Sequence, residues 1–218
     1  MKIQFSPPYI DSDIIEEVTQ SLNSGWITSG PKVMALEQEV SNLIGIERTV
    51  CVNSWTSGAI LVLKWFGVKA GDEIIVPAYT YSATALAVVH CGARPVMVDI
   101  SDDFTINVEN IEKAITSKTK AVMLAHTLGN PYELDKVVML CKKYGLWLIE
   151  DCCDALGSTY NGRMVGTFGD IATLSFYPAH HITMGEGGAV FTNNSELKKI
   201  AESIRDWGRD CYCEPGKD

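Results

Sequence analysis

The chain has 218 residues, 46% of them hydrophobic, and a formal net charge of −9. A chain of this size can bury a full core, whereas its acidic excess argues against a surface adapted to nucleic-acid phosphates, which bind clustered Lys and Arg. Apolar segments such as 83–89 are too short to cross a bilayer, and the start lacks a basic region followed by an apolar run, so we expect no membrane partner and a cytoplasmic location.

Short apolar segments alternate with segments of helical periodicity along the whole chain. The expected strands are 49–52, 73–77, 94–98, 120–125, 146–150, 171–175 and 189–192. The expected helices are 14–22, 33–44, 56–66, 82–91, 108–115, 133–144 and 195–207, with candidate caps at Asp11, Ser54 and Asn194. This alternation predicts an α/β fold in which helices enclose a sheet whose strands are often apolar on both faces, as buried parallel strands are.

The chain contains seven cysteines, an odd number for a sequence without secretion signals. They stand at positions 51, 91, 141, 152, 153, 211 and 213. Free thiols or metal ligands are therefore favoured over a disulfide framework, and most of the thiols should be buried and inert. The chain stops at "EPGKD", soon after a Cys-x-Cys, and we expect residues 1–218 to form one domain, truncated before a C-terminal domain.

The stretch "NSWTSGAI", residues 53–60, places small hydroxylated residues where a strand ends and a helix begins. Backbone N–H groups and hydroxyls at such a junction can hold a phosphate. An ordinary capped helix explains the same residues, and the stretch alone favours that interpretation.

The stretch "LWLIEDCCDALGS" predicts a buried strand that delivers Asp151 at its carboxyl end. Ligands of open α/β sheets bind at this edge, and a carboxylate there can pair with a cationic ring nitrogen. A helix-capping aspartate is the alternative.

The third stretch, "SFYPAHHITMGEGGAV", places two histidines between an aromatic-Pro turn and a glycine cluster. Together with "NSWTSGAI", "GDEIIVPAYTYSATA" and "EDCCDALGS", and in the same order and spacing, it resembles the pyridoxal-phosphate sugar aminotransferases of the DegT family over nearly the whole chain. The resemblance implies the large domain of the aspartate-aminotransferase-like fold (fold type I), with a mostly parallel sheet between helices and a small C-terminal domain missing or incomplete.

The family pattern has a lysine in this stretch that forms a Schiff base with the cofactor, and this chain has His180 there. An imidazole cannot form that bond, so pyridoxamine phosphate (PMP) or pyridoxal phosphate (PLP) would be held noncovalently, with His180 as a general base. His181 is interpreted as a structural neighbour. The family often has Gln where this chain has Asp154, which receives no role from the resemblance.

The resemblance also assigns the other cofactor contacts by position. Thr56, Ser57 and Ser175 would bind the phosphate. Asp151 would pair with the pyridine nitrogen and make the ring an electron sink. Tyr81 would stack on the ring, with plain core packing as its alternative.

The histidine in place of lysine resembles the PMP-dependent 3-dehydratases of nucleotide-linked 4-keto-6-deoxyhexoses. The CDP-sugar members bind a [2Fe–2S] cluster through a Cys-x57-Cys-x-Cys-x7-Cys spacing, which Cys153, Cys211 and Cys213 match. The fourth ligand would fall at about position 221, so we expect that the chain as given does not complete the cluster.

The resemblance therefore implies C3 dehydration of a CDP-linked 4-keto-6-deoxyhexose in 3,6-dideoxyhexose (O-antigen, lipopolysaccharide) biosynthesis. A 3-deoxy product needs two further electrons, which implies a flavin and iron–sulfur reductase as partner. The family forms its sites at a homodimer interface. The alternatives are a GDP-4-keto-6-deoxymannose 3-dehydratase, a nucleotide-sugar aminotransferase and an inactive truncated fragment.

Overall fold

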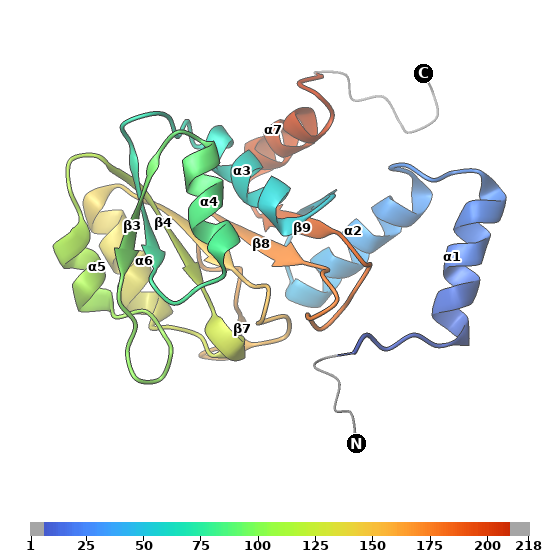
Figure 1. Ribbon diagram of the computed structural model, residues 1–218, viewed down its shortest axis with the longest axis horizontal. Coiled ribbons are helices and arrows are strands. Elements are labelled where there is room, and N and C mark those ends of the chain that lie inside the picture. Colours follow the sequence, from blue (N-terminus) through green and yellow to red (C-terminus); the bar gives the residue numbers. More distant parts are fainter. Residues whose placement is uncertain (1–6, 210–218) are drawn as a thin grey trace.

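The computed structural model describes residues 7–209 of the chain (Figure 1). Its helices are α1 Ser12–Ser24, α2 Pro31–Ile44, α3 Trp55–Trp65, α4 Ser82–His90, α5 Val108–Ala114, α6 Leu134–Tyr144 and α7 Ser195–Arg205, with a short 3-10 turn, η1, at Thr127–Gly129. Its strands are β1 Arg48–Val52, β2 Glu73–Pro77, β3 Arg94–Val98, β4 Thr119–Ala125, β5 Trp147–Asp151, β6 Thr159–Tyr160, β7 Arg163–Met164, β8 Ile171–Ser175 and β9 Gly188–Thr192. Every expected helix and strand is present, and the β6–β7 hairpin and η1 are the additions.

The expected caps are confirmed. Asp11, Ser54 and Asn194 are the N-caps of α1, α3 and α7, and each side chain accepts a hydrogen bond from a backbone N–H of the first turn. Such bonds satisfy donors that have no partner within the helix.

Seven strands form one sheet in the order β1-β9-β8-β5-β4-β2-β3. The neighbours from β8 to β3 pair in parallel, whereas β9 is antiparallel to both β8 and β1. The mostly parallel sheet expected from the sequence is thus confirmed, with β9 as the exception. The connection from β8 to β9, residues 176–187, contains no helix, and a short connection without a crossover suits an antiparallel pair.

Helices cover both faces of the sheet (Figure 1). One hydrophobic core joins the sheet to α2, α5 and α6, and a second joins it to α3, α4 and α7. Successive side chains of β2 pack into different cores. Ile75 lies in the core with α2, α5 and α6, and Ile74 and Val76 lie in the core with α3, α4 and α7. Because side chains alternate along a strand, a strand buried on both faces must be apolar throughout.

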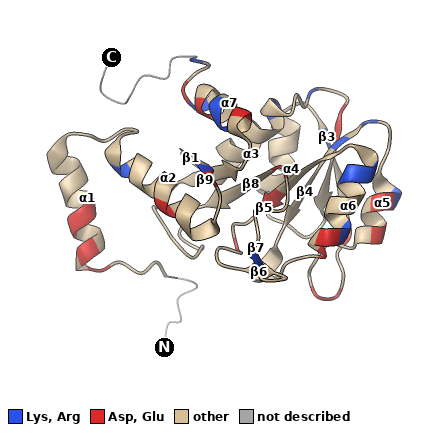
Figure 2. Cartoon of the chain, turned by 180° about the vertical axis from the view of Figure 1, so that it is seen from behind, with Lys and Arg blue, Asp and Glu red and all other residues tan. Residues whose placement is uncertain are grey.

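The lengths of the helices and the positions of the basic side chains bear on what a membrane or nucleic-acid partner would need. None of the helices between residues 7 and 209 is long and apolar enough to cross a membrane. Lys and Arg lie in separate places on α2, α6 and α7 (Figure 2).

The strand register brings the expected site residues to one edge. Asp151, the last residue of β5, pairs with Ala125 at the end of β4 and with Thr173 of β8. Ser175, the last residue of β8, pairs with Gly188, which begins β9. Since parallel strands end at the same edge of a sheet, Asp151 and Ser175 open onto the side where ligands of such sheets bind.

Candidate active site

A cavity of about 660 Å³ lies at this edge of the sheet. Its walls come from positions within 54–56, 79–84, 125–128, 151–154 and 175–180, together with Glu186. Of the residues expected to contact the cofactor or catalyse, Thr56, Tyr81, Asp151, Ser175 and His180 line it, and Ser57 does not. Segments that are far apart in the sequence therefore line one cavity.

The start of α3 forms one wall. Ser54 caps the helix, accepting a hydrogen bond from the Ser57 N–H at 3.2 Å, and the two hydroxyls lie 3.0 Å apart. The first backbone bond of the helix runs from the Gly58 N–H to the Ser54 carbonyl, so the N–H groups of Trp55 and Thr56 precede it. A helix start with such N–H groups and a positive dipole end attracts an anion. The start of α3 can therefore be a capped helix and also a phosphate site. The Ser57 N–H and hydroxyl contact the Ser54 cap.

The last glycine of the "GEGG" run lets β9 approach the helix start. A Cβ on Gly188 would lie 2.7 Å from both the Ser54 carbonyl carbon and the Trp55 nitrogen, so a larger residue cannot stand there without moving backbone. Trp55 fixes the same contact from the other side, because its indole N–H donates to the Thr173 hydroxyl at 2.9 Å. Ser175, which pairs with Gly188, is thereby held beside the start of α3.

Asp151 is 7% exposed, and its partner among the described residues is Cys153, whose N–H donates to Oδ1 at 3.1 Å. Burial raises the pKa of the Asp151 carboxyl above its ordinary value. Within the described part of the chain, no Lys or Arg lines the cavity to offset that charge. A cationic ring nitrogen would supply the missing partner, so this position fits a protonated pyridine.

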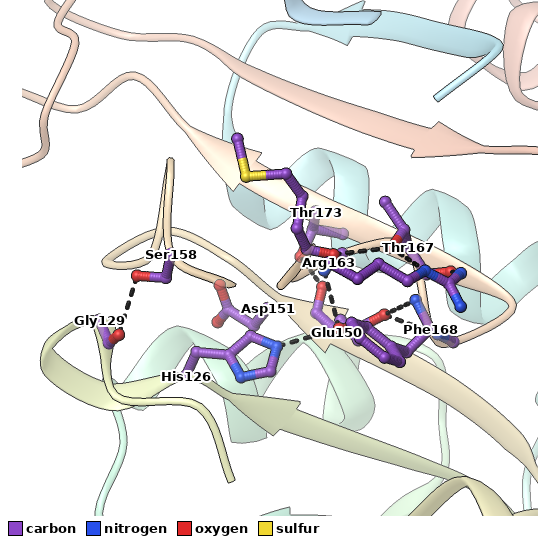
Figure 3. Close-up of polar contacts among 12 residues, drawn as sticks. His126, Gly129, Glu150, Asp151, Ser158, Arg163, Thr167, Phe168 and Thr173 are labelled. Carbon is purple, nitrogen blue, oxygen red and sulfur yellow. Dashed lines mark hydrogen bonds and ion pairs between the residues drawn. The ribbon is translucent and has the colours of Figure 1, made fainter. Parts of the chain in front are cut away.

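The neighbouring Glu150 is a feature that the sequence did not single out (Figure 3). It is fully buried and accepts from the N–H groups of Gly166 and Phe168 at 2.8 Å, from Gly169 at 2.6 Å and from His126 Nε2 at 3.1 Å. Burial alone would raise the pKa of Glu150, but the bond and charge of His126 and the backbone donors hold it below its ordinary value. Glu150 therefore ties the loop after β7 to the strand end that carries Asp151.

His180 and Asp154 meet at the wall of the cavity. His180 Nδ1 lies 3.2 Å from Asp154 Oδ1, although the angles fall short of those of a hydrogen bond. The His180 side chain is 20% exposed, and contact with this imidazole lowers the pKa of Asp154. His181 is exposed. The structure thus gives Asp154 a specific neighbour where the family resemblance gave it no role.

Tyr81 stands at the N-cap of α4 and is 81% exposed on the rim of the cavity. Its alternative interpretation as a core side chain is wrong, because a core residue has almost no exposed surface. An exposed ring at the mouth of a cavity is available to stack on a flat ligand.

The cysteines divide into buried and cavity-lining residues. The five described cysteines are free, and burial raises the pKa of Cys51 and Cys141 to about 12. Cys153 lines the cavity, and burial likewise raises the pKa of its thiol. The other two expected cluster ligands, Cys211 and Cys213, lie outside the described residues, and between residues 7 and 209 no three potential metal ligands gather.

The sequence pattern of the DegT/DnrJ/EryC1/StrS aminotransferase family matches residues 8–214. The lipopolysaccharide biosynthesis protein RfbH of Salmonella typhimurium is 51% identical over 203 residues, which cover 89% of this chain and 46% of that protein. A dTDP-4-dehydro-2,6-dideoxy-D-glucose 3-dehydratase of Saccharopolyspora spinosa is 45% identical over 201 residues, covering 88% of this chain and 44% of that enzyme. The chain thus spans about half the length of these curated relatives.

A solved structure shares the architecture. The putative sugar aminotransferase Spr1654 from Streptococcus pneumoniae, in its PLP form, superposes with a TM-score of 0.89 at 35% identity, covering 94% of this chain and 58% of that one. The similar proteins therefore include a dehydratase and an aminotransferase.

Proposed function

Because the chain belongs to the DegT/DnrJ/EryC1/StrS aminotransferase family, we propose that its cavity binds PMP or PLP noncovalently and that His180 is the general base of a nucleotide-sugar 3-dehydratase. The observation that carries the proposal is the composition of the cavity wall: an imidazole is present, and none of the described lysines lines it. An aminotransferase of this family needs a lysine there, so the aminotransferase alternative is disfavoured.

We propose that the chain holds the cofactor at three points. The first turn of α3 with Thr56, the adjacent Ser57 and the nearby Ser175 would bind the phosphate. Asp151 would accept a hydrogen bond from the protonated ring nitrogen, and Tyr81 would stack on the ring. When bound, the cofactor supplies an amine that reacts with a ketone and a ring that takes up electrons.

His180 would move the proton. An imidazole can exchange a proton at neutral pH, and a general base of this kind typically contributes about 10²–10⁴-fold. Because Nδ1 lies 3.2 Å from Asp154 Oδ1, Nε2 would be the nitrogen left to accept a proton from C4′ of the cofactor. Among the described residues that line the cavity, no lysine offers the covalent attachment that an aminotransferase uses, which favours loss of the C3 hydroxyl as water.

We propose a CDP-linked 4-keto-6-deoxyhexose as substrate, in the biosynthesis of 3,6-dideoxyhexoses for lipopolysaccharide. The similarity to RfbH and to a 3-dehydratase supports a dehydration in such a pathway. The choice of CDP over GDP rests on the cysteine spacing alone, and a GDP-4-keto-6-deoxymannose 3-dehydratase is the alternative.

The same spacing supports a [2Fe–2S] cluster bound by Cys153, Cys211, Cys213 and a fourth ligand from outside this sequence. Loss of water leaves the sugar two electrons short of a 3-deoxy product, so a flavin and iron–sulfur reductase would deliver them singly through the cluster. After anaerobic reconstitution, Cys153→Ser should hold less iron and sulfide than the parent protein. Equal iron and sulfide contents would remove Cys153 from the ligand set.

A second copy of the chain would complete the site. The diphosphate of a nucleotide sugar and the phosphate of the cofactor favour Lys or Arg side chains nearby, and the described wall of the cavity has none. Tyr79, Tyr81, Leu128 and Tyr177 on the wall are each more than half exposed, as expected for a surface that another protein covers. We therefore propose a homodimer in which the partner closes the cavity and contributes basic side chains.

Borohydride trapping tests the noncovalent site. The parent protein incubated with PLP and reduced should carry no pyridoxyl label at residue 180, whereas a His180→Lys variant should carry one there, as located by peptide mass spectrometry. The variant is the matched control, because it shows whether the cavity delivers PLP to that residue. A parent protein labelled at one specific lysine, or a variant without label at residue 180, would refute the proposal.

A further inference from the structure

We infer that Asp154 is the positioning residue of the site, holding the His180 imidazole in the tautomer that carries its proton on Nδ1 and leaves Nε2 free as the base. The inference rests on the proposed function of His180 and adds a residue to which the family resemblance gave no role. It stands on the geometry of two turns.

Asp154 and His180 are brought together by neighbouring strands. Asp154 lies in the turn after β5, three residues past Asp151, and His180 lies in the turn after β8. Because β5 and β8 pair in parallel, both turns leave the same edge of the sheet and meet at the cavity. The pairing of β5 with β8 therefore places the two turns close together, and the side chains then bring Oδ1 and Nδ1 to 3.2 Å.

The turn that carries His180 is itself tethered. The His180 N–H donates to the Tyr177 carbonyl at 3.0 Å, and the Met184 N–H donates to the Phe176 carbonyl at 2.9 Å. Phe176 is 1% exposed and anchors the start of the turn in the core. The backbone that carries the His180 side chain is therefore held in place near Asp154.

A carboxylate can only accept hydrogen bonds, so a ring nitrogen that bonds to Asp154 must carry the proton, and Nδ1 is the nitrogen that lies 3.2 Å from it. In a neutral imidazole the other nitrogen then has the lone pair that a general base requires. Once Nε2 has taken a proton, the Asp154 charge stabilises the imidazolium, as the aspartate of a Ser-His-Asp triad does. The loose angles do not oppose this role, because such bonds often tighten only when substrate binds.

A plain surface ion pair is the competing explanation. Asp154 is 48% exposed, and exposed pairs of this kind contribute little to stability. The two explanations differ in what they predict, since a surface pair leaves the tautomer and the rate of proton transfer unchanged. The other ionisable groups on the cavity wall are Asp151, Cys153, Glu186, His126 and the rim tyrosines.

The test compares ¹⁵N spectra of the histidine side chains in the parent protein and in Asp154→Asn, with the His180 signals identified by their loss in His180→Asn. We expect a protonated Nδ1 and an unprotonated Nε2 in the parent, and a mixture of tautomers in Asp154→Asn. Asp102→Asn removes an exposed carboxylate outside the cavity and should leave the spectrum of His180 unchanged.

The second readout is exchange of the C4′ proton of PMP in the presence of a CDP-4-keto-6-deoxyhexose. Asp154→Asn should lower kcat for exchange by about 10- to 10²-fold with little change in KM, and Asp154→Glu, which keeps the charge, should recover part of the loss. An unchanged His180 tautomer together with a parental exchange rate in Asp154→Asn would overturn the inference. If His180→Asn itself exchanged at the parental rate, the proposed function would fail instead.

Discussion

Glu150 and Asp151 are adjacent at the end of β5 and are both buried, yet their pKa values shift in opposite directions. Among the described residues, Glu150 accepts four hydrogen bonds, which help to hold its pKa below the ordinary value, whereas the Asp151 carboxylate accepts one from the Cys153 N–H and burial raises its pKa. A buried carboxylate whose oxygens all accept hydrogen bonds from the protein stabilises the fold. One left short of partners in a cavity is available to a ligand.

Replacing Glu150 by Gln should give the largest effect on stability. In either orientation the amide would turn its NH2 group towards backbone N–H donors that need an acceptor, either Gly166 beside His126 or Phe168 with Gly169. We expect a loss of about 3 kcal/mol in the free energy of unfolding, measured by urea denaturation. Glu39→Gln, at an exposed position, should change it by less than about 0.5 kcal/mol. Similar losses of unfolding free energy in Glu150→Gln and Glu39→Gln would contradict the structural role given to Glu150.

Replacing Asp151 by Asn should act on binding instead. A charge-assisted bond to the ring nitrogen is worth about 1.5–3 kcal/mol, so PMP affinity should fall about 10- to 10²-fold by titration, with no loss of stability. Asp170→Asn is the matched control, because burial also raises the pKa of Asp170, which accepts from the Leu148 N–H and lies outside the cavity. Equal PMP affinities in the two variants would contradict the role of Asp151.

The pH dependence of stability should separate the parent from Glu150→Gln. The folded-state pKa of Glu150 lies below its ordinary value of 4.5, so its stabilisation is present above that value and is lost as pH falls through the folded-state pKa. The difference in unfolding free energy between the two proteins should therefore shrink below about pH 4.5 in urea titrations. A difference that stays constant down to pH 3 would show that folding does not lower the pKa of Glu150.

Replacing Tyr81 should give the smallest effect. Because the ring is exposed, Tyr81→Ala should change the unfolding free energy by less than about 0.5 kcal/mol. Loss of an aromatic stacking partner should weaken PMP binding about 3- to 10-fold, and Tyr81→Phe, which keeps the ring, should bind like the parent. An Ala variant with parental affinity would remove Tyr81 from the cofactor contacts.

The sequence predicts the edge of the sheet well, because apolar runs that end in polar residues mark strand ends and caps. Asp151 and Ser54 are predicted in this way, whereas Ser175 is assigned by the family resemblance. It did not reveal Glu150, whose partners are backbone N–H groups sixteen to nineteen residues later, and no side-chain pattern signals such donors.

Two other features were not predicted, one because it depends on tertiary structure and one because the sequence signals conflict. The contact between Asp154 and His180 joins turns that only the pairing of β5 with β8 brings together. The direction of β9 was open to inference from its short, helix-free connection, although its apolar composition resembles that of the parallel strands.

Exchange of the C4′ proton of PMP, with a CDP-4-keto-6-deoxyhexose present, tests the central claim most directly. The account predicts that His180→Asn loses exchange by about 10²–10⁴-fold while it binds PMP as tightly as the parent, because the imidazole moves the proton and Asp151 with the start of α3 holds the cofactor. Parental exchange in His180→Asn would show that another group is the base and would contradict the account.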